Sequence, residues 1–158
     1  MAHRGDMRTG IVVALFCVIG CAPAVPPPHV LLADVDRDID EPVRTYPLEA
    51  GADFRKDQIG GTPGSTVFLV QVRGGESPHR HVTHDLAVTL LRGHGVLHIA
   101  GVELPMRAGD VAVIPRGVAH WYTNAGKRPS ITLAVYTPAL DAPDSVPVDA
   151  VDSRGGAR

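Results

Sequence analysis

The segment GDVAVIPRGVAHWYTN, residues 109–124, consists of two short apolar runs on either side of a Pro-Arg-Gly turn. Valine is frequent in these runs and favours extended strands. Pro115 lacks the N–H group that a sheet would use, and Gly117 suits a turn with unusual backbone angles. The segment therefore predicts a β-hairpin with His120 at its far end.

Similar β-forming runs flank this segment in both directions. Gly, Pro and Asn interrupt them at close intervals, and no stretch shows a sustained helical period. The chain is 44% hydrophobic but only 4% aromatic, so Val, Leu, Ile and Ala must supply most of its core. Many short strands predict an all-β sandwich or barrel, with jelly rolls among the candidates. The expected strands cover residues 66–73, 84–91, 95–100, 102–107, 110–114, 118–123 and 131–137.

The beginning of the chain is typical of a secretion signal. A cationic head precedes an apolar run at residues 11–19, which is too short to cross about 30 Å of hydrocarbon. The sequence VIGC at residues 18–21 resembles the lipobox of bacterial lipoproteins. That resemblance implies cleavage before Cys21, diacylglycerol on its sulfur and acylation of the new amine. Two or three acyl chains hold a protein firmly on a membrane.

An ordinary signal peptide cut after Ala22 or Ala24 is the alternative interpretation. We expect a protein of the cell envelope, anchored outside the cytoplasm by lipid rather than spanning the membrane. If the host has two membranes, the absence of Asp after Cys21 favours the outer membrane or the periplasmic side.

The composition predicts one folded domain between two less regular ends. Both cysteines, Cys17 and Cys21, lie in the leader, so the domain has neither a disulfide nor a thiolate metal ligand. The formal net charge is −2, and no basic face favours a nucleic-acid partner. We expect a signal peptide at residues 1–20, a Pro-rich tether at 21–29, an irregular extension with edge strands at 30–64, a barrel at 65–140 and a disordered tail at 141–158.

Histidines are the candidate functional residues of the predicted barrel. His79 and His81 are two positions apart, so a strand presents both on one face. His84 follows closely, and His120 lies where the second hairpin strand can bring a third imidazole to the same place. Imidazoles that converge in this way suit a divalent metal ion.

The second motif of the cupin family, G-x5-P-x-G-x2-H-x3-N, is met at every fixed position by Gly109, Pro115, Gly117, His120 and Asn124. The first motif, G-x5-H-x-H-x3-4-E-x6-G, is similar to the sequence around His79 and His81, with Gly93 in place and the opening glycine one position from its expected place. The chain therefore resembles small single-domain bacterial cupins over about residues 66–137. This resemblance implies a double-stranded β-helix, or jelly-roll barrel, with one metal near its mouth on His79, His81 and His120.

One ligand position departs from the family pattern. The motif places a glutamate at residue 86, where this chain has Leu86. His84 or Asp85 is the candidate replacement for the fourth ligand. We favour His84 near the metal, with Asp85 orienting a ligand imidazole. A site of three or four imidazoles suits Zn, Cu, Fe or Ni, whereas Asp85 would favour Fe or Mn.

A metal-dependent enzyme, in particular an oxygenase acting on a small organic molecule, is the first functional hypothesis. A non-catalytic module that binds a metal or small ligand at the cell envelope is the second, and a structural barrel without an ion is the third. Tyr122 and Leu86 are expected to line the pocket, and no catalytic residue is assigned. The family resemblance also implies a homodimer formed through the outer face of the barrel.

Overall fold

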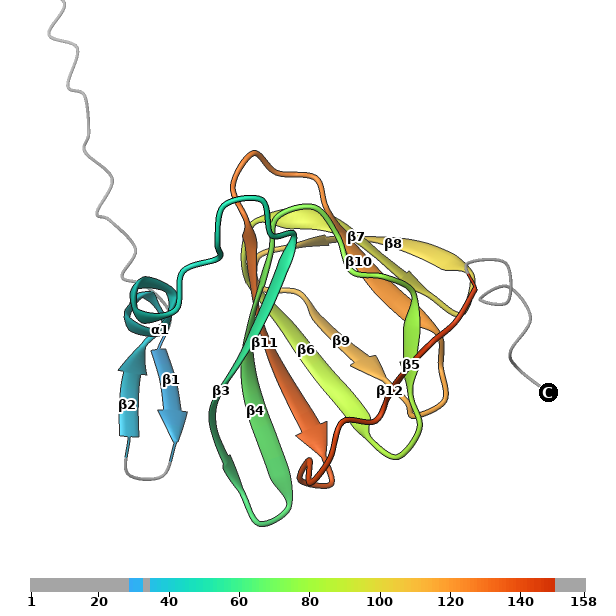
Figure 1. Ribbon diagram of the computed structural model, residues 1–158, viewed down its shortest axis with the longest axis horizontal. Coiled ribbons are helices and arrows are strands. Elements are labelled where there is room, and N and C mark those ends of the chain that lie inside the picture. Colours follow the sequence, from blue (N-terminus) through green and yellow to red (C-terminus); the bar gives the residue numbers. More distant parts are fainter. Residues whose placement is uncertain (1–28, 33–34, 150–158) are drawn as a thin grey trace, which may run out of the picture.

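The barrel consists of two antiparallel sheets that enclose a common core (Figure 1). The computed structural model describes residues 29–32 and 35–149. One sheet contains β5 (His79–His81), β7 (His94–Ile99), β8 (Val102–Arg107), β10 (His120–Asn124) and β12 (Ser145–Pro147). The other contains β3 (Phe54–Thr62), β4 (Ser65–Val72), β6 (Asp85–Arg92), β9 (Val111–Ile114) and β11 (Ser130–Thr137). Their orders are β12-β5-β10-β7-β8 and β3-β4-β11-β6-β9.

The all-β jelly-roll fold predicted from the sequence is confirmed. Each of the seven expected strands is present, with boundaries that differ by no more than two residues. The hairpin expected at residues 109–124 is wrong, because β9 pairs with β6 in one sheet and β10 pairs with β5 and β7 in the other. The interior combines aliphatic side chains of both sheets with a few aromatic rings. This core contains Phe68, Val70, Val72, Leu86, Leu90, Leu97, Met106, Ile114, Tyr122, Ala134 and Tyr136.

Strand β4 is buried on both faces, which explains its continuous apolar sequence. Phe68 points into the barrel, whereas Leu69 points outward and packs with Ile39. Ile39 lies at the start of the helix α1 (Asp40–Thr45), which covers the outer face of the β3-β4-β11 sheet beside the hairpin of β1 (His29–Leu32) and β2 (Val35–Asp38) (Figure 1). The sequence did not predict this helix, because six residues are too few to show a helical period.

Part of the segment expected to be a disordered tail is ordered. Strand β12 pairs with β5, with Ser145 opposite His81 and Pro147 opposite His79. The prediction failed there because a three-residue edge strand needs little apolar surface when an existing sheet supplies its partners. The remainder of the predicted tail, residues 150–158, the leader and the lipidation site Cys21 lie outside the described residues. In the described ranges, no helix is both long and apolar enough to span a bilayer.

Asn124 closes the end of the barrel opposite the histidines. Its amide nitrogen donates hydrogen bonds to the carbonyl oxygens of Arg73, Gly126 and Arg128 at 2.9, 3.1 and 2.9 Å. Its oxygen accepts from Gly126 N and from Ser130 Oγ. The asparagine of the second motif therefore holds a turn in place, because one side chain satisfies several backbone groups that have no strand partner.

Candidate metal centre

The backbone pairing of β5 with β10 brings three histidines together. His79 is directly opposite His120 in the register of these antiparallel strands. His81 lies on the same face of β5 as His79, and the intervening Arg80 is exposed. One ring nitrogen from each of these three histidines lies within 4.8 Å of the other two. The sequence-predicted ligands His79, His81 and His120 are therefore adjacent in space.

Each of the three rings is held through its Nδ1 atom by an oxygen. His79 Nδ1 lies 2.9 Å from the carbonyl oxygen of Ser77, and His120 Nδ1 lies 3.0 Å from that of Val118. His81 Nδ1 lies 2.9 Å from Asp144 Oδ1. Carbonyl and carboxylate oxygens can only accept, so each Nδ1 carries the proton. The Nε2 lone pairs are then left for a metal, as in most histidine ligands whose other nitrogen is hydrogen-bonded.

The fit of this cluster to a cation is tested by the Nε2 atom of His81. This atom is buried and has no hydrogen-bond partner anywhere in the described part of the chain. Leaving a buried acceptor unsatisfied costs roughly 1–3 kcal/mol. Two nitrogens that share a metal at about 2.1 Å each lie no more than about 4.2 Å apart, so small ring rotations suffice. A divalent cation would satisfy this atom and join the three lone pairs.

Burial keeps two of these imidazoles neutral, as metal ligation requires. His81 and His120 are 3% and 4% exposed. Desolvation lowers the pKa of His120 to about 4, although its hydrogen bond to Val118 acts in the opposite direction. Desolvation also lowers the pKa of His81, against the effect of its hydrogen bond to Asp144. Near neutral pH, protons therefore compete little with a metal ion for the nitrogens of these two rings.

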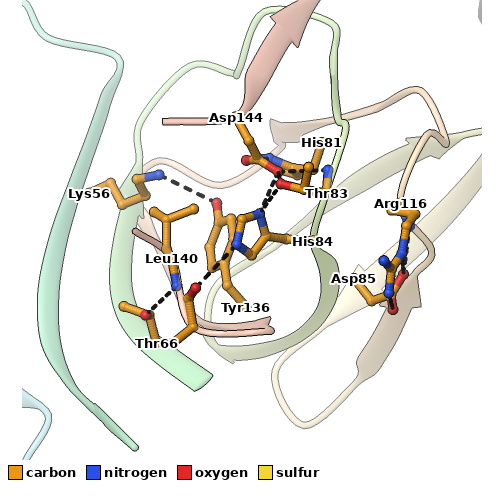
Figure 2. A network of polar contacts seen from close by, with 11 residues as sticks. Lys56, Thr66, His81, Thr83, His84, Asp85, Arg116, Tyr136, Leu140 and Asp144 are labelled. Atoms are coloured by element: carbon orange, nitrogen blue, oxygen red, sulfur yellow. Dashed lines mark hydrogen bonds and ion pairs between the residues drawn. The ribbon is translucent and has the colours of Figure 1, made fainter. Parts of the chain in front are cut away.

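Asp144 is a residue of the candidate site that the sequence did not predict. Its carboxylate accepts from the Nδ1 atoms of His81 and His84, at 2.9 and 2.6 Å, and from the backbone and hydroxyl of Thr83 (Figure 2). Burial alone would raise the pKa of Asp144, but these hydrogen bonds outweigh it and lower the pKa. Asp144 therefore has the orienting position that we expected for Asp85.

The structure places neither candidate for the fourth ligand in the cluster. His84 Nδ1 is hydrogen-bonded to Asp144, the His84 and Tyr136 ring centroids are 6.1 Å apart, and His84 does not line the cavity. Asp85 is at the surface, where it forms an ion pair with Arg116 that lowers the Asp85 pKa to about 2 (Figure 2). Strand alternation explains the position of Asp85, since its neighbour Leu86 faces the interior.

A cavity of about 640 Å³ adjoins the three histidines. Leu86 and Tyr122, the predicted pocket residues, both line it. Glu76 lines it as well: one of its carboxylate oxygens accepts from the Tyr122 backbone N–H at 3.1 Å, and burial raises its pKa. Glu76 was not predicted from the sequence, because it lies in an irregular loop and matches no motif. The wall is otherwise mainly apolar, so the site can enclose a small organic molecule beside the histidines.

Residues 66–136 match the family model of the cupin domain. An uncharacterized protein of Aquifex aeolicus (strain VF5) is 39% identical over 92 residues, which cover 58% of this chain and 75% of that protein.

Solved structures of similar fold share little sequence with this chain. An uncharacterized conserved protein with a double-stranded β-helix domain from Klebsiella pneumoniae has a TM-score of 0.59 at 22% identity, covering 68% of this chain and 94% of that one. KdgF from Halomonas sp. has a TM-score of 0.54 at 21% identity, covering 59% and 87%. Streptomyces PAC13, solved with uridine, has a TM-score of 0.53 at 22% identity, covering 61% and 79%. The two facing antiparallel sheets, the three-histidine cluster beside the cavity and the family match agree: residues 66–136 of this chain form a cupin domain.

Proposed function

We propose that this protein binds one divalent metal ion through His79, His81 and His120 and acts on a small organic molecule in the adjoining cavity. The buried Nε2 of His81 carries this proposal, because a cation is the partner that its surroundings lack. PAC13, solved with uridine, illustrates that a barrel of this fold can hold a small molecule. Three imidazole donors suit Zn, Fe, Ni or Cu better than Mn.

The arrangement leaves room for chemistry beside the ion. Three protein ligands leave at least one coordination position free, as in catalytic metal sites. A metal bound there would act as a Lewis acid towards an oxygen atom of the substrate. The chain supplies a mainly apolar cavity, imidazole rings fixed by their Nδ1 hydrogen bonds and the partly buried Glu76 carboxyl group, which can hold or release a proton.

A binding module without catalysis is the second candidate function. Leu86 favours it, because this side chain replaces the family's carboxylate ligand with an apolar surface at the cavity wall. The ion would then capture a ligand rather than activate it.

Metal loading followed by product analysis tests the proposal. The full-length protein should bind one equivalent of Zn²⁺ or Fe²⁺ in equilibrium dialysis. A chelator added to this metal-loaded protein should remove the ion. A library of small organic molecules is then incubated with the loaded and chelated forms and followed by mass spectrometry. Metal-dependent conversion of a compound supports the enzyme; retention of unchanged compounds supports the binding module. Failure to retain any metal contradicts both.

We also propose that the chain is anchored at the cell envelope through lipid on Cys21. The lipobox-like sequence at residues 18–21 supports this. Cys21→Ser should abolish incorporation of labelled palmitate and shift the protein out of the membrane fraction. Cys17→Ser, four residues earlier in the apolar run, is the matched control and should remain labelled. Equal labelling of the wild type and Cys21→Ser would exclude the anchor.

A further inference from the structure

A lysine ammonium lies at the rim of the same cavity. Lys56, on β3, lines the cavity and places its Nζ 4.6 Å from the ring centre of Phe68 and 5.0 Å from that of Tyr136. Its hydrogen bond to the Tyr136 hydroxyl is long, at 3.4 Å (Figure 2). The side chain as a whole is exposed, so the ammonium is held over two rings at the entrance and remains accessible.

This ammonium has no anionic partner among the described residues. The Asp144 and Glu76 carboxylates are near enough to affect it electrostatically, yet neither forms a hydrogen bond or ion pair with it. The Asp144 oxygens accept from His81, His84 and Thr83 instead. Lys56 therefore retains N–H donors that can reach a ligand.

The Tyr136 hydroxyl adds a second donor at the same place. A tyrosine hydroxyl carries its proton near neutral pH and can therefore donate it to a ligand. Its oxygen accepts from Lys56, and across the described ranges no acceptor takes its hydrogen. An ammonium with N–H groups to spare and a phenol whose hydrogen has no acceptor together form a site for an anionic oxygen.

We infer that the cavity selects small organic carboxylates, with the carboxylate between Lys56 and Tyr136 and an apolar body inside the barrel. The apolar wall includes Val70, Val72, Leu97 and Ile114, which suits a hydrocarbon or aromatic body. A carboxylate fits two such donors better than a phosphate group, which proteins usually bind with an arginine fork or several backbone N–H groups. The inference deepens the proposed function by assigning a ligand class to its cavity.

The test compares charged and neutral probes of matching shape. Benzoate and hexanoate are titrated into the full-length protein beside benzyl alcohol, 1-hexanol and phenylphosphonate, by calorimetry, in metal-loaded and chelated forms. We expect the carboxylates to bind at least about tenfold more tightly than the alcohols, since a hydrogen bond to a charged group contributes this much or more. Lys56→Met should weaken carboxylate binding about tenfold in both the metal-loaded and the chelated form. The affinity for the alcohols should not change.

Lys127→Met is the matched control, because the chain has two lysines and Lys127 is exposed in a turn away from the cavity. It should bind like the wild type, and Lys56→Arg should retain most of the carboxylate preference. The inference is overturned if Lys56→Met binds carboxylates normally, if no carboxylate binds, or if phenylphosphonate binds more tightly. Metal content is measured in every variant: loss of metal from the wild type contradicts the proposed function, whereas bound metal without carboxylate preference contradicts this inference alone.

Discussion

His120→Ala should leave a folded barrel that no longer retains a divalent metal. His120 supplies one of three converging ring nitrogens, and its removal leaves two ligands from a single strand. Removal of a hydrogen-bond partner behind a ligand typically lowers metal affinity about 10- to 100-fold. We expect the removal of His120, a ligand itself, to lower it further. Elemental analysis after dialysis against limiting Zn²⁺ measures the loss, and circular dichroism reports whether the sheets remain.

His94→Ala is the matched control for this substitution. His94 is an exposed residue of β7 and lies outside the three-histidine cluster. Its replacement should leave one bound metal per chain. If His120→Ala retains the metal as firmly as His94→Ala does, the ion is not held by the cluster, and the proposed function fails.

Asp144→Asn should lower metal affinity by about 10- to 100-fold while all three imidazole ligands remain. The carboxylate holds the Nδ1 proton of His81, which keeps the lone pair of Nε2 directed to the cluster. An asparagine has one acceptor oxygen for two histidine donors, and its NH₂ group opposes the other. The His81 ring is then free to rotate or to change tautomer. Competition with a chelator of known affinity measures the effect.

The absorption spectrum of the Co²⁺-loaded protein separates this positioning role from general destabilisation. Asp144→Asn should alter the ligand-field bands, because the orientation of one ligand ring changes. Asp141→Asn, three residues earlier and exposed, should leave both spectrum and affinity unchanged. An unchanged spectrum and affinity in Asp144→Asn would mean that the Asp144 carboxylate holds the C-terminal strand without influencing the metal.

The three histidines of the cluster were predictable because two local rules determine them. Strand alternation puts His79 and His81 on one face, and the second motif puts His120 on a strand that pairs with theirs. The carboxylate that supports them was not predictable, because Asp144 reaches His81 across 63 positions and lies in a segment whose composition resembles a disordered tail. A three-residue strand paired to a sheet edge leaves no periodicity in the sequence.

In the fold, too, features with a local sequence pattern were predictable, and features that depend on a distant partner were not. The seven strands with clear apolar runs were found because each is long enough to show its pattern. Strand β3 lies in the segment expected to be an irregular extension with edge strands, and it is an edge strand. Its bounds were not predicted, since residues such as Arg55, Asp57 and Gly60 interrupt its apolar positions. Its pairing with β4 over nearly its whole length supplies the order that its own sequence lacks.

Lys56, which lines the cavity, and Asp144, which holds the His81 ring, come from outside the region that matches the family model. The cupin match covers residues 66–136, whereas Lys56 precedes it on β3 and Asp144 follows it beside β12. Substitution or exchange of these flanking strands can therefore change ligand choice while the histidine motif stays intact. Homologous barrels with the same motif but different flanks are expected to receive different molecules and to differ in their affinity for the ion.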